Sequence, residues 1–329
     1  MVLFNADKRL EVFNHLEKQT QAAIEKYLKP IDTNWQPTDL LPDPSNLDTF
    51  FKEVTELQNQ AKGLSYDTLA VLVGDTITEE ALPTYESQIM QIHGIHGQDE
   101  ENGWRKWTRL WTAEENRHGD TLNKYLYLSG RVNMREFETS TQFLIADGFN
   151  IETGDDPYRN FIYTSFQEMA TNISHRRVAS LAKKEGDTLL SKICGFVAAD
   201  EARHAKAYTH FMDLVFEVDP SEAMLAFEDM MRKKIVMPAH FLRESGEKVG
   251  QVWGHFTDAA QRIGVYTAAD YSQILRSLIS DWEIEQMRDL NDAAEKAREY
   301  LMRLPDRLDR VAQRLQVPSL EYKFKWIAV

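Results

Sequence analysis

Apolar residues recur at intervals of three and four along most of the chain, which is the spacing of helices that bury one face. The first such pattern covers 8–29 and ends at Pro30. Further patterns, separated by glycine or proline, predict helices over 47–61, 65–93, 104–129, 134–146, 158–184, 187–216, 221–244, 249–263, 268–282 and 291–315. We therefore predict an all-α fold.

Proline interrupts the pattern in two places near the N-terminus. The segment 32–46 contains several prolines, and we expect an extended connection over the surface there. Pro83 lies inside the helix predicted over 65–93, where it cannot donate the usual hydrogen bond to the carbonyl of Glu79. We therefore expect a kink beside Glu79.

The last residues alternate between apolar and polar positions, which favours a short C-terminal strand or β-hairpin with one face formed by Tyr322, Phe324 and Trp326. The chain has 329 residues, 43% of them hydrophobic, and is long enough for one large domain or two. Because no linker or low-complexity segment divides it, we predict a single domain over 1–329.

Composition and charge narrow the classes of function. The formal net charge of −14 argues against nucleic acid or anionic lipid as a partner of the whole surface. The one cysteine, Cys194, cannot form an internal disulfide, which is typical of a reducing compartment. No apolar stretch reaches the ~18 residues that span a membrane, and the N-terminus resembles neither a signal nor a transit peptide. We expect a soluble protein without membrane insertion, cytoplasmic in a bacterium or stromal if it is a processed plastid form.

A short motif, acid-Glu-x-Arg-His, occurs twice, at 114–118 and at 200–204. Residues three apart share a helix face, so each copy points one carboxylate and one imidazole at the same spot. A lone glutamate precedes each copy on an earlier predicted helix: Glu168 before the second, and Glu79 or its neighbour Glu80 before the first. This arrangement predicts a ferritin-like four-helix bundle with a di-iron or di-manganese centre, extended by additional helices.

The motifs also have simpler interpretations. A single Glu-x-x-His is compatible with a satisfied ion pair in the core, and Glu114 beside Glu115 is compatible with a solvated face. Repetition of the flanking acid and the arginine favours the metal centre. Oxygen and imidazole ligands suit iron or manganese, and the lack of clustered cysteines argues against iron–sulfur or structural zinc. Asp200 and Glu114, next to the ligands, are candidates to hold the histidines by their second ring nitrogen, across the helix pair.

Four blocks of this sequence resemble the soluble acyl-[acyl carrier protein] desaturases, whose best-known member is the stearoyl enzyme of plant plastids. They are 111–120 (WTAEENRHGD), 123–132 (NKYLYLSGRV), 161–168 (FIYTSFQE) and 198–204 (AADEARH). The segments 78–85, 229–235 and 261–268 match as well, so the similarity covers nearly the whole chain.

The resemblance implies a homodimeric di-iron enzyme of fatty acid biosynthesis. Such an enzyme takes two electrons from reduced ferredoxin and one O₂, and inserts a cis double bond, usually Δ9, into a saturated chain on acyl carrier protein. The resemblance also selects Glu79 over Glu80. The implied iron ligands are Glu79, Glu115, His118, Glu168, Glu201 and His204.

The same resemblance gives roles to residues beside the iron. Trp111 resembles the tryptophan that links iron to the surface through Asp200 and His118, although a core position would also explain it. Thr171 resembles the threonine beside the oxygen-binding face and is the candidate catalytic residue. A helical threonine that bonds its own backbone is the simpler alternative.

Substrate recognition is where this chain departs from the family pattern. Asn160 replaces a small glycine near the far end of the acyl pocket, and Ile151 replaces a proline, so we expect a shorter pocket. Acyl carrier protein and ferredoxin are both acidic, as is this chain, so binding needs a local positive patch. The candidate for the carrier protein is the basic run Arg232, Lys233 and Lys234.

Two other functions use similar centres. A ribonucleotide-reductase small subunit would have a tyrosine beside an aspartate ligand, whereas the first ligand here is Glu79. An iron-storage protein of the ferritin type would need only about half this length. The sequence therefore favours the desaturase.

Overall fold

The structure is a computed structural model that describes residues 6–148, 150–318 and 322–328. The chain begins with α1 (Ala6–Leu16), the 3₁₀ turn η1 (Glu17–Gln19) and α2 (Thr20–Tyr27), which together cover the first predicted helix. An irregular connection with one 3₁₀ turn, η2 (Pro37–Asp39), leads to α3 (Leu47–Ala61), as predicted.

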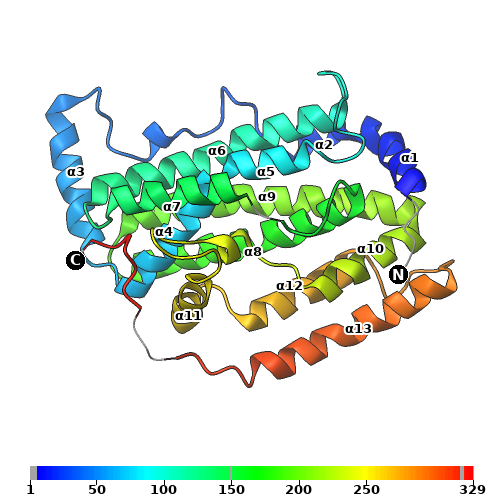
Figure 1. Cartoon of the computed structure of the whole chain (residues 1–329). Coiled ribbons are helices and arrows are strands. Elements are labelled where there is room, and N and C mark those ends of the chain that lie inside the picture. Colours follow the sequence, from blue (N-terminus) through cyan, green and yellow to red (C-terminus); the bar gives the residue numbers. More distant parts are fainter. Residues whose placement is uncertain (1–5, 149, 319–321, 329) are drawn as a thin grey trace.

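Four long helices form the centre of the molecule: α4 (Tyr66–Glu80), α6 (Gly103–Ser129), α8 (Pro157–Lys184) and α9 (Thr188–Val218). α8 and α9 lie side by side, α4 packs against α6 and α8, and α6 packs against α9 (Figure 1). The shorter helices α5 (Leu82–Ile89) and α7 (Met134–Asp147) lie outside this bundle. The predicted all-α, ferritin-like fold is confirmed.

The break beside Glu79 is also confirmed, and it is sharper than a kink. α4 ends at Glu80, Ala81 leaves the helical conformation, and α5 starts again with Pro83 in its first turn. α6 packs closely against this break at Gly119, where a Cβ atom would lie 3.1 Å from the backbone carbonyl of Glu79. Pro83 and Gly119 together fix the position of Glu79 along the axis of the bundle.

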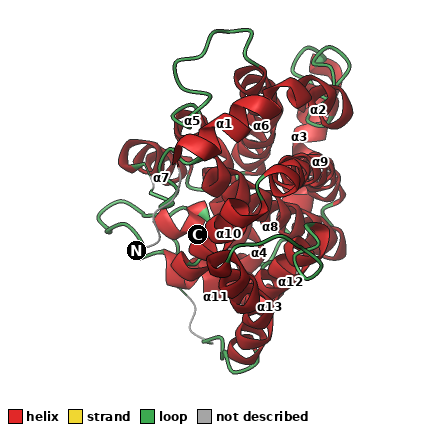
Figure 2. Ribbon diagram, turned by 90° about the vertical axis from the view of Figure 1, so that its right-hand side faces the viewer, coloured by secondary structure: helices red, strands yellow, loops and turns green. Residues whose placement is uncertain are grey.

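The additional helices pack on one side of the bundle (Figure 2). They are α10 (Pro220–Lys233), the 3₁₀ turn η3 (Pro238–Phe241), α11 (Trp253–Ile263), α12 (Ala268–Asp281) and α13 (Asp292–Ala312). The helix predicted over 221–244 was too long, because Lys234 adopts a left-handed φ of 64° and ends it. The residues between Lys234 and α11 form an irregular segment that contains η3.

The expected C-terminal hairpin is wrong for the part of the chain that the structure describes. Val132 and Ile327 form an isolated antiparallel bridge there, and no strand is present among the described residues. Phe324 and Trp326 are buried, with stacked rings 4.9 Å apart. The alternating aromatic residues therefore anchor the chain end on the bundle through side-chain packing.

Buried apolar side chains from α1 to α13 belong to one hydrophobic cluster, which includes Cys194. The single domain over 1–329 stays a prediction. None of the helices that the structure describes is both long and apolar enough to cross a membrane.

Candidate metal centre

Six carboxylate and imidazole side chains meet in the middle of the bundle. α4 and α8 supply one glutamate each, and α6 and α9 supply the two Glu-x-x-His pairs. Ligand atoms within 4.8 Å of one another form two groups. One group is Glu79, Glu115, His118 and Glu201, and the other is Glu115, Glu168, Glu201 and His204. The structure thus brings all six predicted residues together, and two of the glutamates belong to both groups.

The inward-facing atoms fit metal ligation. Nδ1 of His118, Nδ1 of His204 and one oxygen each of Glu115 and Glu201 are buried without a hydrogen-bond partner. Nδ1 of His118 lies 3.1 Å from Glu201 and Nδ1 of His204 lies 2.5 Å from Glu115. Buried polar atoms rarely lack a partner, so these residues fit a site for cations, which the members of both groups would hold.

Electrostatics lead to the same conclusion. Burial and the nearby Glu115 and Glu201 carboxylates raise the pKa of Glu168 well above its usual range. Burial alone would also raise the pKa of Glu115, but the imidazoles of His118 and His204 hold that pKa at about 2. Four carboxylates in a dry core need compensating positive charge, which two divalent cations would supply.

Each histidine is held from outside by the acid of the other motif. Nε2 of His118, on α6, lies 3.5 Å from Asp200 on α9. Nε2 of His204, on α9, lies 3.0 Å from Glu114 on α6. The structure thus places each acid beside the histidine of the other motif, across the helix pair, and this placement gives the repeated acid a role. Such contacts orient the ring, and Nδ1 of each histidine would then be the atom that binds a metal ion.

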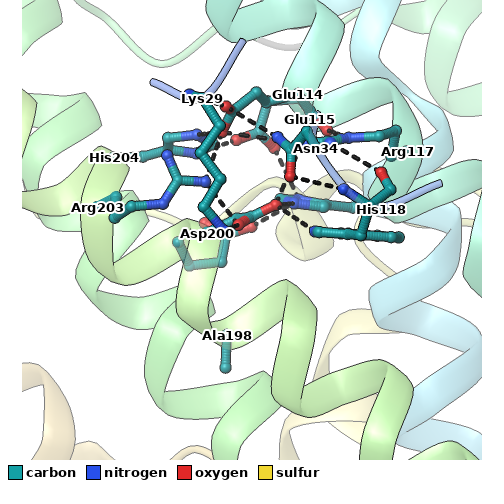
Figure 3. A network of polar contacts seen from close by, with 12 residues as sticks. Lys29, Asn34, Glu114, Glu115, Arg117, His118, Ala198, Asp200, Arg203 and His204 are labelled. Carbon is teal, nitrogen blue, oxygen red and sulfur yellow. Dashed lines mark hydrogen bonds and ion pairs between the residues drawn. The ribbon is translucent and has the colours of Figure 1, made fainter. Parts of the chain in front are cut away.

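The repeated arginines neutralise these two acids (Figure 3). Arg203 donates to Asp200 at 2.6 Å and to Glu114 at 2.8 Å, and Arg117 donates to Asp200 at 3.2 Å. The backbone N–H of Lys29 donates to Glu114 at 2.7 Å. All four positions of the motif therefore act in the centre or in the network around it.

The tryptophan beside Asp200 and His118 is Trp35, and the prediction that Trp111 joins them is wrong. Trp35 donates its indole N–H to Asp200 at 2.9 Å, and its ring stacks on His118 with 6.2 Å between centroids. Trp111 donates to Glu168 at 3.0 Å instead. Trp35 lies in the irregular connection 32–46, where no periodic pattern reveals an inward side chain. Its only signal is a large aromatic residue among prolines.

Two further side chains on α8 contact the centre. The hydroxyl of Thr171 donates to Glu201 at 2.6 Å and also lies 3.1 Å from the carbonyl of Glu168. Nε2 of His175 lies 2.8 Å from Glu79. Thr171 is therefore more than a helical threonine bonded to its own backbone, and His175 positions Glu79.

A cavity of about 360 Å³ leads to the centre. It starts between α11 and α13, at the exposed side chains of Val311 and Leu315, and extends to Glu115, Glu168 and Glu201. Leu82 and Tyr85, both buried, are also part of its lining. Most of its lining is apolar. One polar side is formed by Asp75, Thr171 and Ser174, with a hydrogen bond of 2.8 Å from Ser174 to Asp75.

Neither residue predicted at the pocket end lines this cavity. Asn160 is buried, and its amide donates to the carbonyls of Gly154 and Asp156 at 2.9 Å. Ile151 is buried nearby in the loop before α8. Asn160 therefore stabilises the loop that starts α8, whereas Tyr85 and Leu82 line the cavity.

The predicted carrier-binding residues lie at the end of α10, just before two cavity-lining residues, Ile235 and Val236. Arg232 pairs with Glu228 at 2.6 Å and stacks on the ring of Tyr300 at 3.9 Å. Lys233 pairs with Asp229 at 3.0 Å. Part of the positive charge of this run is therefore already neutralised.

Comparisons with known proteins agree with this geometry. Residues 8–328 match the family model described as fatty acid desaturase. The chain is 48% identical to stearoyl-[acyl-carrier-protein] 9-desaturase 1, chloroplastic, of Arabidopsis thaliana, over 97% of this chain and 82% of that protein. It is 47% identical to the stearoyl-[acyl-carrier-protein] 9-desaturase, chloroplastic, of Ricinus communis, over 97% and 81%.

An X-ray structure described as the acyl-ACP desaturase DesA2 of Mycobacterium tuberculosis H37Rv has the same fold. Its TM-score is 0.52 at 15% identity, covering 87% of this chain and 99% of that one. The resemblance found in the sequence motifs is confirmed by the family match. The chain therefore belongs to the fatty acid desaturase family.

Proposed function

We propose that this chain is an oxygen-dependent desaturase that inserts a cis double bond, at the Δ9 position, into a saturated acyl chain carried on acyl carrier protein. The observation that carries the proposal is the metal centre at the side of an apolar cavity open to the surface. The names of the relatives in Arabidopsis and Ricinus support the substrate class and the bond position.

The metal would be a pair of irons held by the six carboxylate and imidazole ligands. Bound iron supplies the O₂ activation that side chains alone do not provide. Two hydrogen atoms of the acyl chain, two electrons and two protons together reduce one O₂ to two waters as the double bond forms.

The protein supplies position and a dry environment. The apolar cavity holds the acyl C–H bonds beside the centre and excludes water from it. The Thr171 hydroxyl lies on the cavity lining and donates to Glu201, where it can hold a proton next to the reacting chain. We assign Trp35 and Asp200, rather than Trp111, to the side that receives electrons from ferredoxin, and we expect a homodimer.

A single reaction tests the assignment. The iron-loaded protein is mixed with stearoyl- and palmitoyl-acyl carrier protein, ferredoxin, ferredoxin reductase and NADPH, and O₂ is admitted. Gas chromatography–mass spectrometry of the acyl product should show a new cis double bond at one position. No double bond on any acyl chain would overturn the proposal. Iron accumulating as a mineral core would favour the ferritin alternative.

Tyr85→Ala should shift the preferred acyl chain to a longer one, because the buried ring of Tyr85 lines the cavity and its removal adds space there. The comparison variant is Asn160→Gly, which removes the larger residue predicted from the sequence to shorten the pocket. Relative rates with carriers bearing chains of different length measure the preference. If Asn160→Gly changed the preferred chain length and Tyr85→Ala did not, the prediction would be wrong. The end of the bound acyl chain would then lie beyond the cavity described above.

A further inference from the structure

One face of α13 carries a row of arginines. Three of them, spaced four and three residues apart, lie on the same side of the helix, and the fourth lies in the turn that follows Ala312. All are exposed: Arg303, Arg307, Arg310 and Arg314. We call this row the α13 arginine face. In Figures 1 and 2, α13 lies on the outer edge of the additional helices, opposite α6.

The positive charge of this face is largely unneutralised. Among the described residues, Arg303 has an ion pair, 3.6 Å from Glu299, and no ion pair is found for the other three arginines. The nearby acids of α13 point elsewhere: Asp306 and Asp309 pair with Arg276 of α12, at 2.7 and 2.5 Å. The arginine face therefore presents positive charge to solvent on a protein whose net charge is −14.

The arginine face borders the mouth of the acyl cavity. Val311 follows Arg310 by one residue, which is about 100° around the helix, and Leu315 follows Arg314 after the helix has ended. Both line the cavity, and they are 63% and 50% exposed. Leu308 and Ala312, farther around the same helix, line the cavity as well. One helix thus joins a positive surface to the entrance of an apolar channel.

We propose that the α13 arginine face is the docking surface for the acidic acyl carrier protein, which feeds its acyl chain into the cavity past Val311 and Leu315. This inference rests on the proposed function. An acidic partner is repelled by most of an acidic enzyme, so a local positive patch beside the channel steers it and fixes its orientation. The run Arg232, Lys233 and Lys234 is a weaker patch, because Glu228 and Asp229 already pair with two of its members.

Reversal of three charges tests the proposal in the iron-loaded full-length protein. The variant Arg307→Glu/Arg310→Glu/Arg314→Glu should raise KM for acyl-carrier substrate and the Kd of stearoyl-acyl carrier protein by about tenfold or more. The kcat at saturation and the iron content should stay unchanged, since none of these side chains contacts the centre. The salt dependence of Kd should also become shallower. Single Arg→Gln changes should give graded, smaller effects.

Two matched triple variants sharpen the result. Lys18→Glu/Lys26→Glu/Lys106→Glu carries the same charge change on exposed residues near α2 and α6, on the far side, and should leave KM and Kd for the carrier unchanged. Arg232→Glu/Lys233→Glu/Lys234→Glu tests the sequence-predicted run and should have the smaller effect of the two patches.

Unchanged carrier binding in the α13 variant would overturn the docking surface, and so would a rise in KM for ferredoxin instead of the carrier. An equal effect of the far-side variant would mean that net charge alone matters, which would also overturn it. Failure of the proposed function looks different: the wild-type protein would then form no double bond with any acyl carrier substrate.

Discussion

Glu115→Ala should abolish binding of both metal ions and, with it, all desaturation. Glu115 belongs to both ligand groups, so its removal takes a ligand from each metal position at once. Loss of a residue that merely orients a ligand already costs about 10–100-fold in metal affinity, and loss of a shared ligand should cost more. Glu79→Ala is the matched comparison, because Glu79 belongs to one group alone. That variant should keep about one metal ion per chain.

Metal content by mass spectrometry and the absorption of a Co(II)-substituted protein measure both variants. Urea unfolding in the presence of a chelator measures the stability of the metal-free protein, and so distinguishes a loss of metal binding from a loss of folding. The metal-free Glu115→Ala protein should fold but be less stable than wild type, because the imidazoles of His118 and His204 lose the carboxylate that pairs with them. Equal metal content in the two variants would contradict the shared position of Glu115.

Asp200→Ala should lower the free energy of unfolding of the metal-free protein by about 3–5 kcal/mol. Asp200 is 1% exposed and accepts hydrogen bonds from Trp35, Arg117 and Arg203. Its removal leaves the guanidinium groups with one carboxylate, Glu114, in place of two. Urea unfolding measures the change, and Asp213→Ala, on a half-buried position of the same helix, should cost less than about 1 kcal/mol.

The same network makes the metal-free protein sensitive to acid. Burial alone would raise the pKa of Asp200 and of Glu114. Hydrogen bonds from His118 and Arg203 nevertheless hold the pKa of Asp200 well below its usual range, and those from His204 and Arg203 hold that of Glu114 at about 2. Both acids therefore stabilise the fold above their unfolded pKa values, and this stabilisation is lost as pH falls. The loss between about pH 5 and 2 should be smaller in Asp200→Ala.

His204 acts in the opposite direction. Burial would lower its pKa, but the carboxylates of Glu115 and Glu114 raise it to about 9 in the metal-free protein. Its contribution to stability is complete below the ordinary histidine pKa and is lost as pH rises through about 9.

A stability that fell with acid in wild type and in Asp200→Ala to the same extent would argue against the network as its source.

Much of the centre could be predicted because helix geometry is local. The spacing of Glu115 with His118, and of Glu201 with His204, places each pair on one face before any tertiary contact forms. The predicted helix ends near glycine or proline agree with the structure for α3, α6, α7 and α8. The Glu79 break followed from Pro83 for the same reason, since the missing hydrogen bond lies within one turn.

The errors have a common cause in long-range packing. Trp35 contacts Asp200 across 165 residues of sequence, from a connection without any periodic pattern. The end of α10 at Lys234 and the packed aromatic residues near the C-terminus depend on what lies beside them in space. To decide whether Trp111 or Trp35 contacts Asp200, one must know where the connection 32–46 lies relative to α6 and α9. No local sequence rule gives that position.

The sequence by itself therefore determined the helices, the two Glu-x-x-His pairs and the family, because these depend on residue type and on spacing within a turn or two of helix. The tertiary structure alone decided which acid supports which histidine, which tryptophan meets Asp200, and where the cavity opens. It also placed the α13 arginine face at that opening. These features depend on contacts between segments far apart in the chain, and their geometry exists only after the helices have packed.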